Sequence, residues 1–364
     1  MSNLGTIAVG IKAPIIKQGD NLEQIVVDCF ANAVVELGIA PSDGDVLGIT
    51  ESIVARSQGN YVSVEEIALE TVRLFGRDAE ITVVNPIYSR NRFAICLRGI
   101  ARSAKKIKLV MPAFDEVGNP GWSEHPFTKC VYSSYYKDIC ESEGAEVEFT
   151  SDIEQFSNNV LIASIHNRNQ LKSDISGFNH EFNVHTLCDY FPDKCEYGLL
   201  GSNKAGEELV KLFPNVRKAR QFVYKVQEML DKKFPNNHLE VLTYGDGCFK
   251  NSFTKGVSIW ELADPVVCPA YTAGLEGVPN EVKIKYLADN EFATLRGEEL
   301  QDSIKNAIKE RLNNDLIGDM DNQGCTPRSF TDIYGSTMDL ISGSGSKGTP
   351  FVWLHNPRKN YSQD

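Results

Sequence analysis

The chain has 364 residues, of which 42% are hydrophobic and 24% charged; this composition is typical of a globular protein and excludes a disordered tail, a collagen and a coiled coil. Its 37 basic and 49 acidic residues give a formal net charge of −12, which disfavours binding to nucleic acids and to anionic membranes. The length allows two domains, or one core with a large insertion.

Targeting and cysteine patterns favour a reducing compartment. The opening MSNLGTIAVG carries no secretory signal, and no segment approaches the roughly 18 apolar residues of a membrane span. We therefore expect a cytoplasmic protein without membrane contact. The nine cysteines are scattered and include no CxxC pair, so we expect buried, reduced thiols and no zinc site or disulfide framework.

The first third of the chain alternates between predicted strands and helices. Extended, apolar segments predict strands at 7–16, 46–49, 93–101 and 107–112. Apolar residues at steps of three and four predict helices at 22–37 and 63–75. Asp20 or Asn21 is the expected N-cap of the first helix and Gly38 its C-cap, while Ser63 and Glu66 form a capping box for the second.

The composition changes at about residue 113, where polar and aromatic residues become frequent. This region contains two strand-like segments, 144–150 and 159–165, and a polar connection over 167–183. A clear helical period then returns at 215–234, followed by a strand at 238–244. We therefore predict a core formed by 1–112 and 214–364, with 113–213 inserted as a lid, an acceptor-binding subdomain or an oligomer contact.

Two clusters of polar and basic residues suggest anion binding. In the first, the strand at 46–49 leads into Thr50, Glu51 and Ser52, and Arg56 follows; the alternative is an ordinary turn with a surface arginine. The second cluster has four arginines in thirteen residues, whose forks suit phosphate or carboxylate, with intrachain ion pairs as the alternative. These are Arg90, Arg92, Arg98 and Arg102.

The spacing of the arginines makes a further prediction. If an unbroken strand runs from Ser89 to Arg98, then Arg90, Arg92 and Arg98 share one face, because side chains of a strand alternate. We expect a glycine-rich loop near the C-terminus to close over the same anionic ligand.

Two more clusters lie in the C-terminal part of the chain. The strand LEVLTY delivers Asp246 between two glycines, an arrangement suited to holding Mg²⁺ or Mn²⁺ beside a phosphate, or else a surface turn. The segment GSGSKG supplies backbone N–H groups at Gly343 and Gly345 together with Lys347, the ingredients of an anion nest, or else simple flexibility. Just upstream, Asp332 is a second candidate cation ligand.

In their order along the chain, these segments resemble the coenzyme F-420:L-glutamate ligase (gamma-glutamyl ligase) family. The resemblance rests on GDVLGITESIVARSQG, RFAICLRGIARS, the block from ARQFVYKVQEML through LEVLTYGDGCFKNSF to GVSIWEL, and PRSFTDIYGSTMDL. It covers roughly residues 5–112 and 214–352. Two positions depart from the family pattern: Ser52 stands where the family usually has Lys, and Ala101 where it usually has a metal-binding Asp.

The resemblance implies an α+β, gamma-glutamyl-ligase-like core that includes a nucleotide-binding site. It implies a ligase that uses GTP or ATP and Mg²⁺ or Mn²⁺ to join an amino acid, L-glutamate, to a small-molecule carboxylate acceptor through an acyl phosphate. It also implies a homodimer. Alternatives are a non-catalytic nucleotide-binding relative, or a phosphotransferase that lacks the amine step.

The residues expected to carry this chemistry fall into three sets. The catalytic residues are Arg56 and Arg92. The metal ligands are Asp246 and Asp332. The nucleotide-binding residues are Ser52, Arg56, Arg98, Gly343, Gly345 and Lys347.

Overall fold

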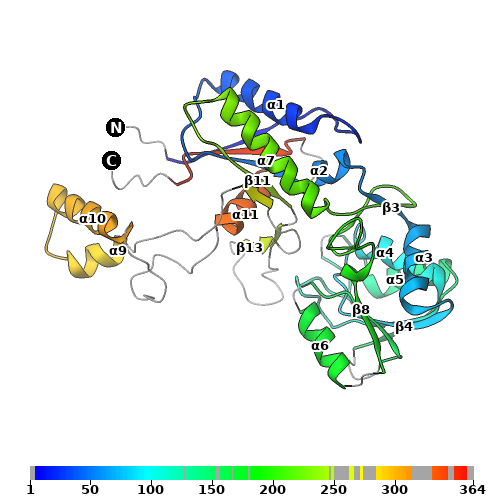
Figure 1. The fold of residues 1–364 in the computed structure, drawn as a ribbon. Helices are drawn as coiled ribbons and strands as arrows, with labels where there is room; N and C mark the ends of the chain where they lie inside the picture. The colour runs from blue at the N-terminus through cyan, green and yellow to red at the C-terminus, as the bar shows by residue number, and fades with distance from the viewer. Residues whose placement is uncertain are drawn as a thin grey trace.

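Two five-stranded sheets, each covered by helices, make up most of the structure, which is a computed structural model (Figure 1). It describes residues 5–126, 128–151, 156–165, 167–178, 181–245, 247–249, 262–265, 271–273, 284–312, 330–342 and 348–358. Helices and strands are mixed in several sheets, which confirms the predicted α+β class. No helix in these ranges is long and apolar enough to cross a membrane.

The first sheet is built from both ends of the chain. Its order is β1-β15-β2-β11-β14. The strands are β1 (Ile7–Ile11), β2 (Val46–Thr50), β11 (Glu240–Tyr244), β14 (Tyr271–Ala273) and β15 (Phe351–His355). β2 and β11 run parallel, and every other neighbouring pair is antiparallel. The C-terminal strand β15 is therefore an inner strand, inserted between β1 and β2.

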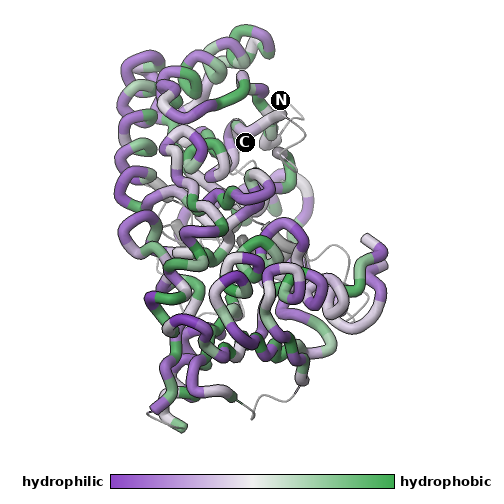
Figure 2. Tube along the Cα trace, turned by 90° about the vertical axis from the view of Figure 1, so that its right-hand side faces the viewer, coloured by the Kyte–Doolittle hydropathy of each residue, from purple (hydrophilic) through white to green (hydrophobic). Residues whose placement is uncertain are grey.

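Helices cover both faces of this sheet. α1 (Leu22–Leu37) and α7 (Val216–Lys233) lie on one face, and α11 (Phe330–Ser342) lies on the other (Figure 1). Alternate residues of β2 divide between the two sides: Leu47 packs in one core with Phe30, and Val46 packs in another with Met338. The helices are amphipathic in the way this layering needs, and Figure 2 shows hydrophilic and hydrophobic residues alternating along their turns.

A buried carboxylate fixes β15 beside β2. Asp45 is 0% exposed and immediately precedes β2. One of its oxygens accepts hydrogen bonds from Trp353 Nε1 and His355 Nδ1, each at 2.9 Å, and the other accepts one from the backbone N–H of Asn356 at 2.8 Å. The backbone N–H of Ser42 donates a further bond at 2.9 Å. Four donors thus satisfy a carboxylate that burial alone would destabilise.

The second sheet is parallel throughout, in the order β6-β5-β4-β7-β8. Its strands are β4 (Ala79–Val84), β5 (Ala104–Val110), β6 (Glu146–Thr150), β7 (Asn159–Ile162) and β8 (Asn183–Thr186). One face packs against α3 (Val64–Phe75), α4 (Phe93–Ser103) and α5 (Tyr132–Ser142), and the other against α6 (Arg168–Phe178). Strands from both sides of residue 112 share this sheet, so its limits do not coincide with the predicted insertion at 113–213.

Smaller elements connect the two sheets and extend the chain. A three-stranded sheet, β3-β10-β9, joins residues from both sides of the second sheet in sequence. The remaining elements are α2 (Glu51–Ser57), β3 (Tyr61–Ser63), β9 (Asn203–Lys204), β10 (Leu209–Lys211), the antiparallel pair β12 (Gly247–Phe249) and β13 (Leu262–Pro265), α9 (Ile284–Tyr286) and the longer helix α10 (Gly297–Leu312). Single helical turns occur at Leu187–Asp189 and Leu287–Glu291. The six cysteines whose side chains the structure describes are free thiols.

Most of the predicted N-terminal elements are confirmed. The Asn21 side chain caps α1, Gly38 ends it in the left-handed conformation, and Ser63 with Glu66 forms the capping box of α3. The long helix α7 and the strands β5, β6, β7 and β11 also occur where predicted. The polar connection over 167–183, by contrast, contains α6.

The predicted strand at 93–101 is wrong, because this segment forms α4. Eight of its eleven residues are buried, and the first five, residues 93–97, are all apolar and buried, so this part of the segment offers no polar position from which the strand and helix periods can be told apart. Gly99 shows why the helix packs closely: a Cβ at this position would lie 2.5 Å from Ile67 Cγ2 of α3. The prediction that Arg90, Arg92 and Arg98 share a strand face fails for the same reason.

We expect Asp45→Asn to lower the free energy of unfolding by about 3 kcal/mol or more, because the amide nitrogen faces buried donors that need an acceptor. Urea unfolding followed by Trp353 fluorescence measures this loss. Asp43→Asn is the matched control, since Asp43 is exposed and accepts a single bond from the backbone N–H of His238. Equal stability of the two variants would contradict the proposed importance of the buried carboxylate.

Candidate functional site

The candidate site lies where the parallel strands β2 and β11 end. Thr50 is paired with Tyr244 in the register, so the residues that follow both strands emerge at one edge of the sheet. Gly245 packs directly against Glu51: a Cβ at this position would lie 2.4 Å from Glu51 Cγ. Only glycine allows this approach, which explains the first glycine of the GDG motif. Asp246 follows in the sequence but lies outside the described residues.

Ser52 and Arg56 stand on a helix that begins immediately after β2. The ordinary turn that the sequence leaves open as the alternative to an anion site is absent, because these residues form α2, with Thr50 at its N-cap position. Ser52 and Arg56 are four residues apart, so they share one face of α2. Ser52 is half-buried and Arg56 is exposed. A hydroxyl and a guanidinium are thereby available on one face at the strand end.

The glycine-rich segment begins and ends at the same edge. Ser342, the last residue of α11, lies beside the buried hydroxyl of Tyr244; burial raises the pKa of this phenol, and the Ser342 hydroxyl partly opposes the shift. After the segment, Pro350 O accepts a hydrogen bond from the backbone N–H of Thr50 at 2.9 Å. The intervening Gly343, Gly345 and Lys347 lie outside the described residues, so their nucleotide-binding role stays a prediction.

A buried ion pair lies behind the strand ends. Both carboxylate oxygens of Glu51 lie 3.0 Å from Lys211 Nζ, and the two side chains are only 7% and 9% exposed. Lys211 belongs to β10 and thus ties the small three-stranded sheet to the start of α2. Neither member of this pair is among the site residues predicted from the sequence. The sequence signal that points to the pair is a lysine inside the apolar run LVKLF.

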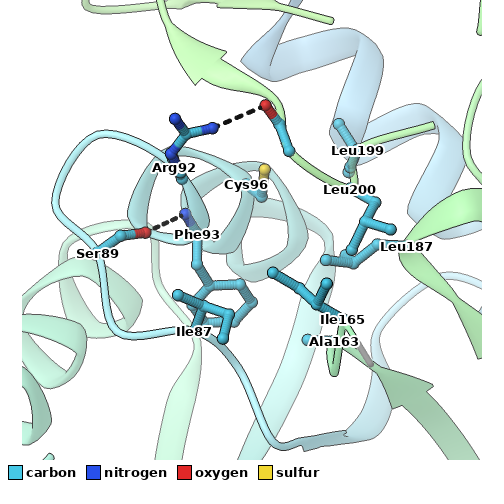
Figure 3. A pocket seen from close by; sticks show the side chains of 11 residues that line it. Ile87, Ser89, Arg92, Phe93, Cys96, Ala163, Ile165, Leu187, Leu199 and Leu200 are labelled. Carbon is cyan, nitrogen blue, oxygen red and sulfur yellow. Dashed lines mark hydrogen bonds between the residues drawn. The ribbon is translucent and has the colours of Figure 1, made fainter. Parts of the chain in front are cut away.

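The arginines of the second cluster lie away from this edge, within α4 or just before it, and α4 packs on the parallel sheet. Arg92 is at the N-cap position, and its Nη1 donates to Gly201 O at 3.0 Å beside a small cavity (Figure 3). Arg98 pairs with Glu143, and with Glu208 at 2.9 Å. The structure therefore brings the first cluster, and described residues that flank the third and fourth clusters, to one edge and leaves the arginine block on the parallel sheet.

Glu143 has a structural role in binding these arginines. Its carboxylate bonds to both Arg98 and Arg102. Burial by itself raises the pKa of Glu143, but the bonds and charges of the two arginines outweigh burial and lower it. The intrachain ion pairs left open as an alternative for the arginine cluster are thus present at Arg98 and Arg102.

The cation site stays a prediction because its expected ligands are not described. Asp332 lies on α11, but its side chain is not described, and Asp246 is outside the described residues. Among the side chains that are described, no group of three or more His, Cys, Asp or Glu residues is arranged to hold a metal. Ala101, at the family's usual Asp position, is 1% exposed in the core of the parallel-sheet unit.

We expect Lys211→Met to reduce the free energy of unfolding by about 3 to 5 kcal/mol, because it leaves the Glu51 carboxylate buried without its cation. The double variant Glu51→Gln/Lys211→Met removes both charges and should recover most of this loss. Urea unfolding of the wild type and the variants measures both effects. A double variant no more stable than Lys211→Met would contradict the assignment of the cost to an uncompensated buried charge.

Comparison with known families identifies the family of the chain. A family model described as F420-0:Gamma-glutamyl ligase matches residues 10–356, nearly the whole chain. The matched range includes β2 and β11, the helices α2 and α11, and the segments that follow β11 and α11. Among curated proteins, the search finds no significant match. The chain therefore belongs to the F420-0:gamma-glutamyl ligase family, whose members add an amino acid to their substrate.

Proposed function

We propose that the protein is a nucleotide- and metal-dependent ligase that joins L-glutamate to a carboxylate acceptor through an acyl phosphate. The observation that supports this proposal is that β2 and β11 end side by side and that Pro350, which follows the glycine-rich segment, bonds to Thr50 at the same edge, in a chain that belongs to this family. Small-molecule ligands commonly bind outside the carboxyl ends of parallel strands, because loops and helix N-termini converge there.

The proposed reaction needs charge stabilisation and no protein nucleophile. An acceptor carboxylate oxygen attacks the γ-phosphorus of GTP or ATP, and the nucleoside diphosphate leaves. The glutamate amine then attacks the acyl carbon, phosphate leaves with the bonding pair, and the amine loses a proton. Both steps develop negative charge on phosphate oxygens, which cationic side chains and backbone N–H groups stabilise.

In this proposal, the residues at this edge of the sheet bind either the phosphates or the cation. Ser52 and Arg56 face the phosphates from α2, and Gly343, Gly345 and Lys347 close over them from the segment after α11. Asp246 and Asp332 are the proposed ligands of Mg²⁺ or Mn²⁺. When bound, such a cation neutralises phosphate charge.

The two departures from the family pattern, Ser52 and Ala101, favour two alternative functions. Ser52 replaces the usual lysine and reduces the positive charge at the proposed phosphate site by one. A relative that binds a nucleotide without turnover, or that transfers phosphate without using an amine, would tolerate this change. Three assays separate the possibilities: binding of GTP or ATP, phosphate transfer to the acceptor without glutamate, and formation of the glutamyl amide with L-glutamate present. F420-0 is the first acceptor to test, because the family description names it.

We expect Arg56→Met to weaken nucleotide binding about 10- to 100-fold, the range that corresponds to one or two lost charge-assisted hydrogen bonds. Titration of the full chain with GTP and ATP in the presence of Mg²⁺ or Mn²⁺ measures the affinity. Arg77→Met is the matched control, because Arg77 is exposed and lies between α3 and β4 in the other unit. Equal affinity of the two variants would remove Arg56 from the proposed site.

We expect Asp246→Asn to lower the affinity for Mn²⁺ by more than about 100-fold, since loss of a direct ligand exceeds the effect of an outer-shell change. Paramagnetic relaxation of water protons in a Mn²⁺ titration with GTP present measures the affinity, and thermal unfolding checks the fold. Asp43→Asn again serves as the control. Unchanged Mn²⁺ binding in Asp246→Asn would exclude Asp246 as a ligand.

A further inference from the structure

A groove lies where three helices meet on one face of the first sheet. α1 and α7 begin at this groove, and α2 ends there (Figure 1). Its volume is about 400 Å³, within the range of about 300 to 1,000 Å³ that sites for small organic ligands occupy. The groove is therefore large enough to hold such a ligand.

The groove is separate from the ligase edge, which is the edge of the mixed sheet where β2 and β11 end. Both regions use α2, but they use opposite sides of it. Val54 lines the groove and is two residues away from both Ser52 and Arg56, which corresponds to about 200° around a helix axis. A ligand in the groove therefore does not lie on the side of α2 that carries the proposed phosphate residues.

Side chains of opposite charge line the groove from different helices. Lys218 and Lys225 are two turns apart and share one face of α7, while Glu23 is in the first turn of α1. Within the described part of the chain, none of these three side chains forms an ion pair at 4.0 Å or less. The charge of Glu228, one turn further along α7, lies near Lys225. Both signs of charge are thus available to a ligand in this groove.

Two side-chain amides also line the groove, Gln58 at the C-cap of α2 and Gln221 between the two lysines of α7. Gln58 Oε1 accepts a hydrogen bond from the backbone N–H of Asn215 at 3.1 Å, which leaves the amide hydrogens of Gln58 as donors. Gln221 is exposed and offers both donors and an acceptor. A peptide bond carries one N–H and one C=O, so this pair of amides can bond to both of its polar groups.

The floor of the groove is apolar. It is formed by Leu22, Val54 and Phe222, which are 1%, 1% and 6% exposed. A floor that is buried this deeply offers a small apolar surface, so it suits a short aliphatic side chain of a ligand better than a large ring system.

We propose that this groove binds a short peptide with free ends. The terminal carboxylate pairs with Lys218 and Lys225, the terminal ammonium pairs with Glu23, and the peptide bond lies between Gln58 and Gln221. A nucleotide would bring several negative charges close to Glu23, and a polyamine would bring positive charges close to two lysines, whereas a zwitterion meets a group of opposite charge at each end. The site needs neither nucleotide nor metal and does not depend on the proposed ligase reaction.

The test uses the full chain without nucleotide or metal, and the dipeptide alanyl-leucine as the probe. Calorimetric or NMR titration in about 10 mM salt, where exposed charges are weakly screened, should detect its binding. N-acetyl-alanyl-leucine lacks the ammonium and alanyl-leucinamide lacks the carboxylate, and each should bind at least about fivefold more weakly, the effect of one lost exposed ion pair. Leucine lacks the peptide bond and should also bind more weakly than the dipeptide.

Charge-matched variants assign each end of the dipeptide to its partner. Glu23→Gln should abolish the preference for the free amine and keep the preference for the free acid, and Lys218→Gln/Lys225→Gln should do the reverse. Glu36→Gln, at the exposed far end of α1, and Lys285→Gln, on α9, are the controls and should change neither preference. Circular dichroism checks that each variant is folded.

Three results would overturn the proposal: no binding of alanyl-leucine to the wild type, equal binding of the dipeptide and its capped forms, or variants of the groove that keep both preferences. Leucine that binds as tightly as the dipeptide would overturn the role given to the two glutamines. Ligase assays are not part of this readout, so their failure would bear only on the proposed function.

Discussion

The parallel pairing of β2 with β11 is the constraint on which the candidate site depends. It joins residues 46–50 to residues 240–244, and everything between them must leave the sheet and return. Because the pairing is parallel, both strands end at the same edge, and Gly245 meets Glu51 there. An antiparallel pairing of the same strands would place these residues at opposite ends. The contact between the first and third sequence clusters is therefore a consequence of strand direction.

Local signals in the sequence were sufficient for α1, α3 and α7. The caps of α1 and α3 and the period of α7 each depend on residues within a few positions of one another. The failure at α4 has an equally local cause, since the segment opens with five apolar, buried residues that do not mark a period. Strand partners, by contrast, depend on distant residues, which is why the sequence did not reveal that the arginine block and the ligase edge belong to different sheets.

Of the two connections between the sheets, the one after β8 contacts both the small cavity of the parallel sheet and the edge of the mixed sheet. Leu199 and Gly201 line the cavity of the parallel sheet, and Lys211, a few residues later, holds Glu51 at the edge of the mixed sheet. Between them, β9 and β10 pair with each other, and β10 pairs with β3. Position in the sequence did not indicate this bridge, because the apolar run around Lys211 suggests its burial but not its partner Glu51, which lies 160 residues away in the chain.

The insertion of β15 between β1 and β2 has a consequence for how the protein is made on the ribosome. β1 and β2 are synthesised early, but the strand that separates them is made after all the other strands, and Asp45 gains three of its donors only then. The parallel unit from β4 to β8 has all its strands by residue 186. Nascent chains should therefore acquire this unit first, while β1 and β2 stay without their shared partner until β15 has emerged from the ribosome.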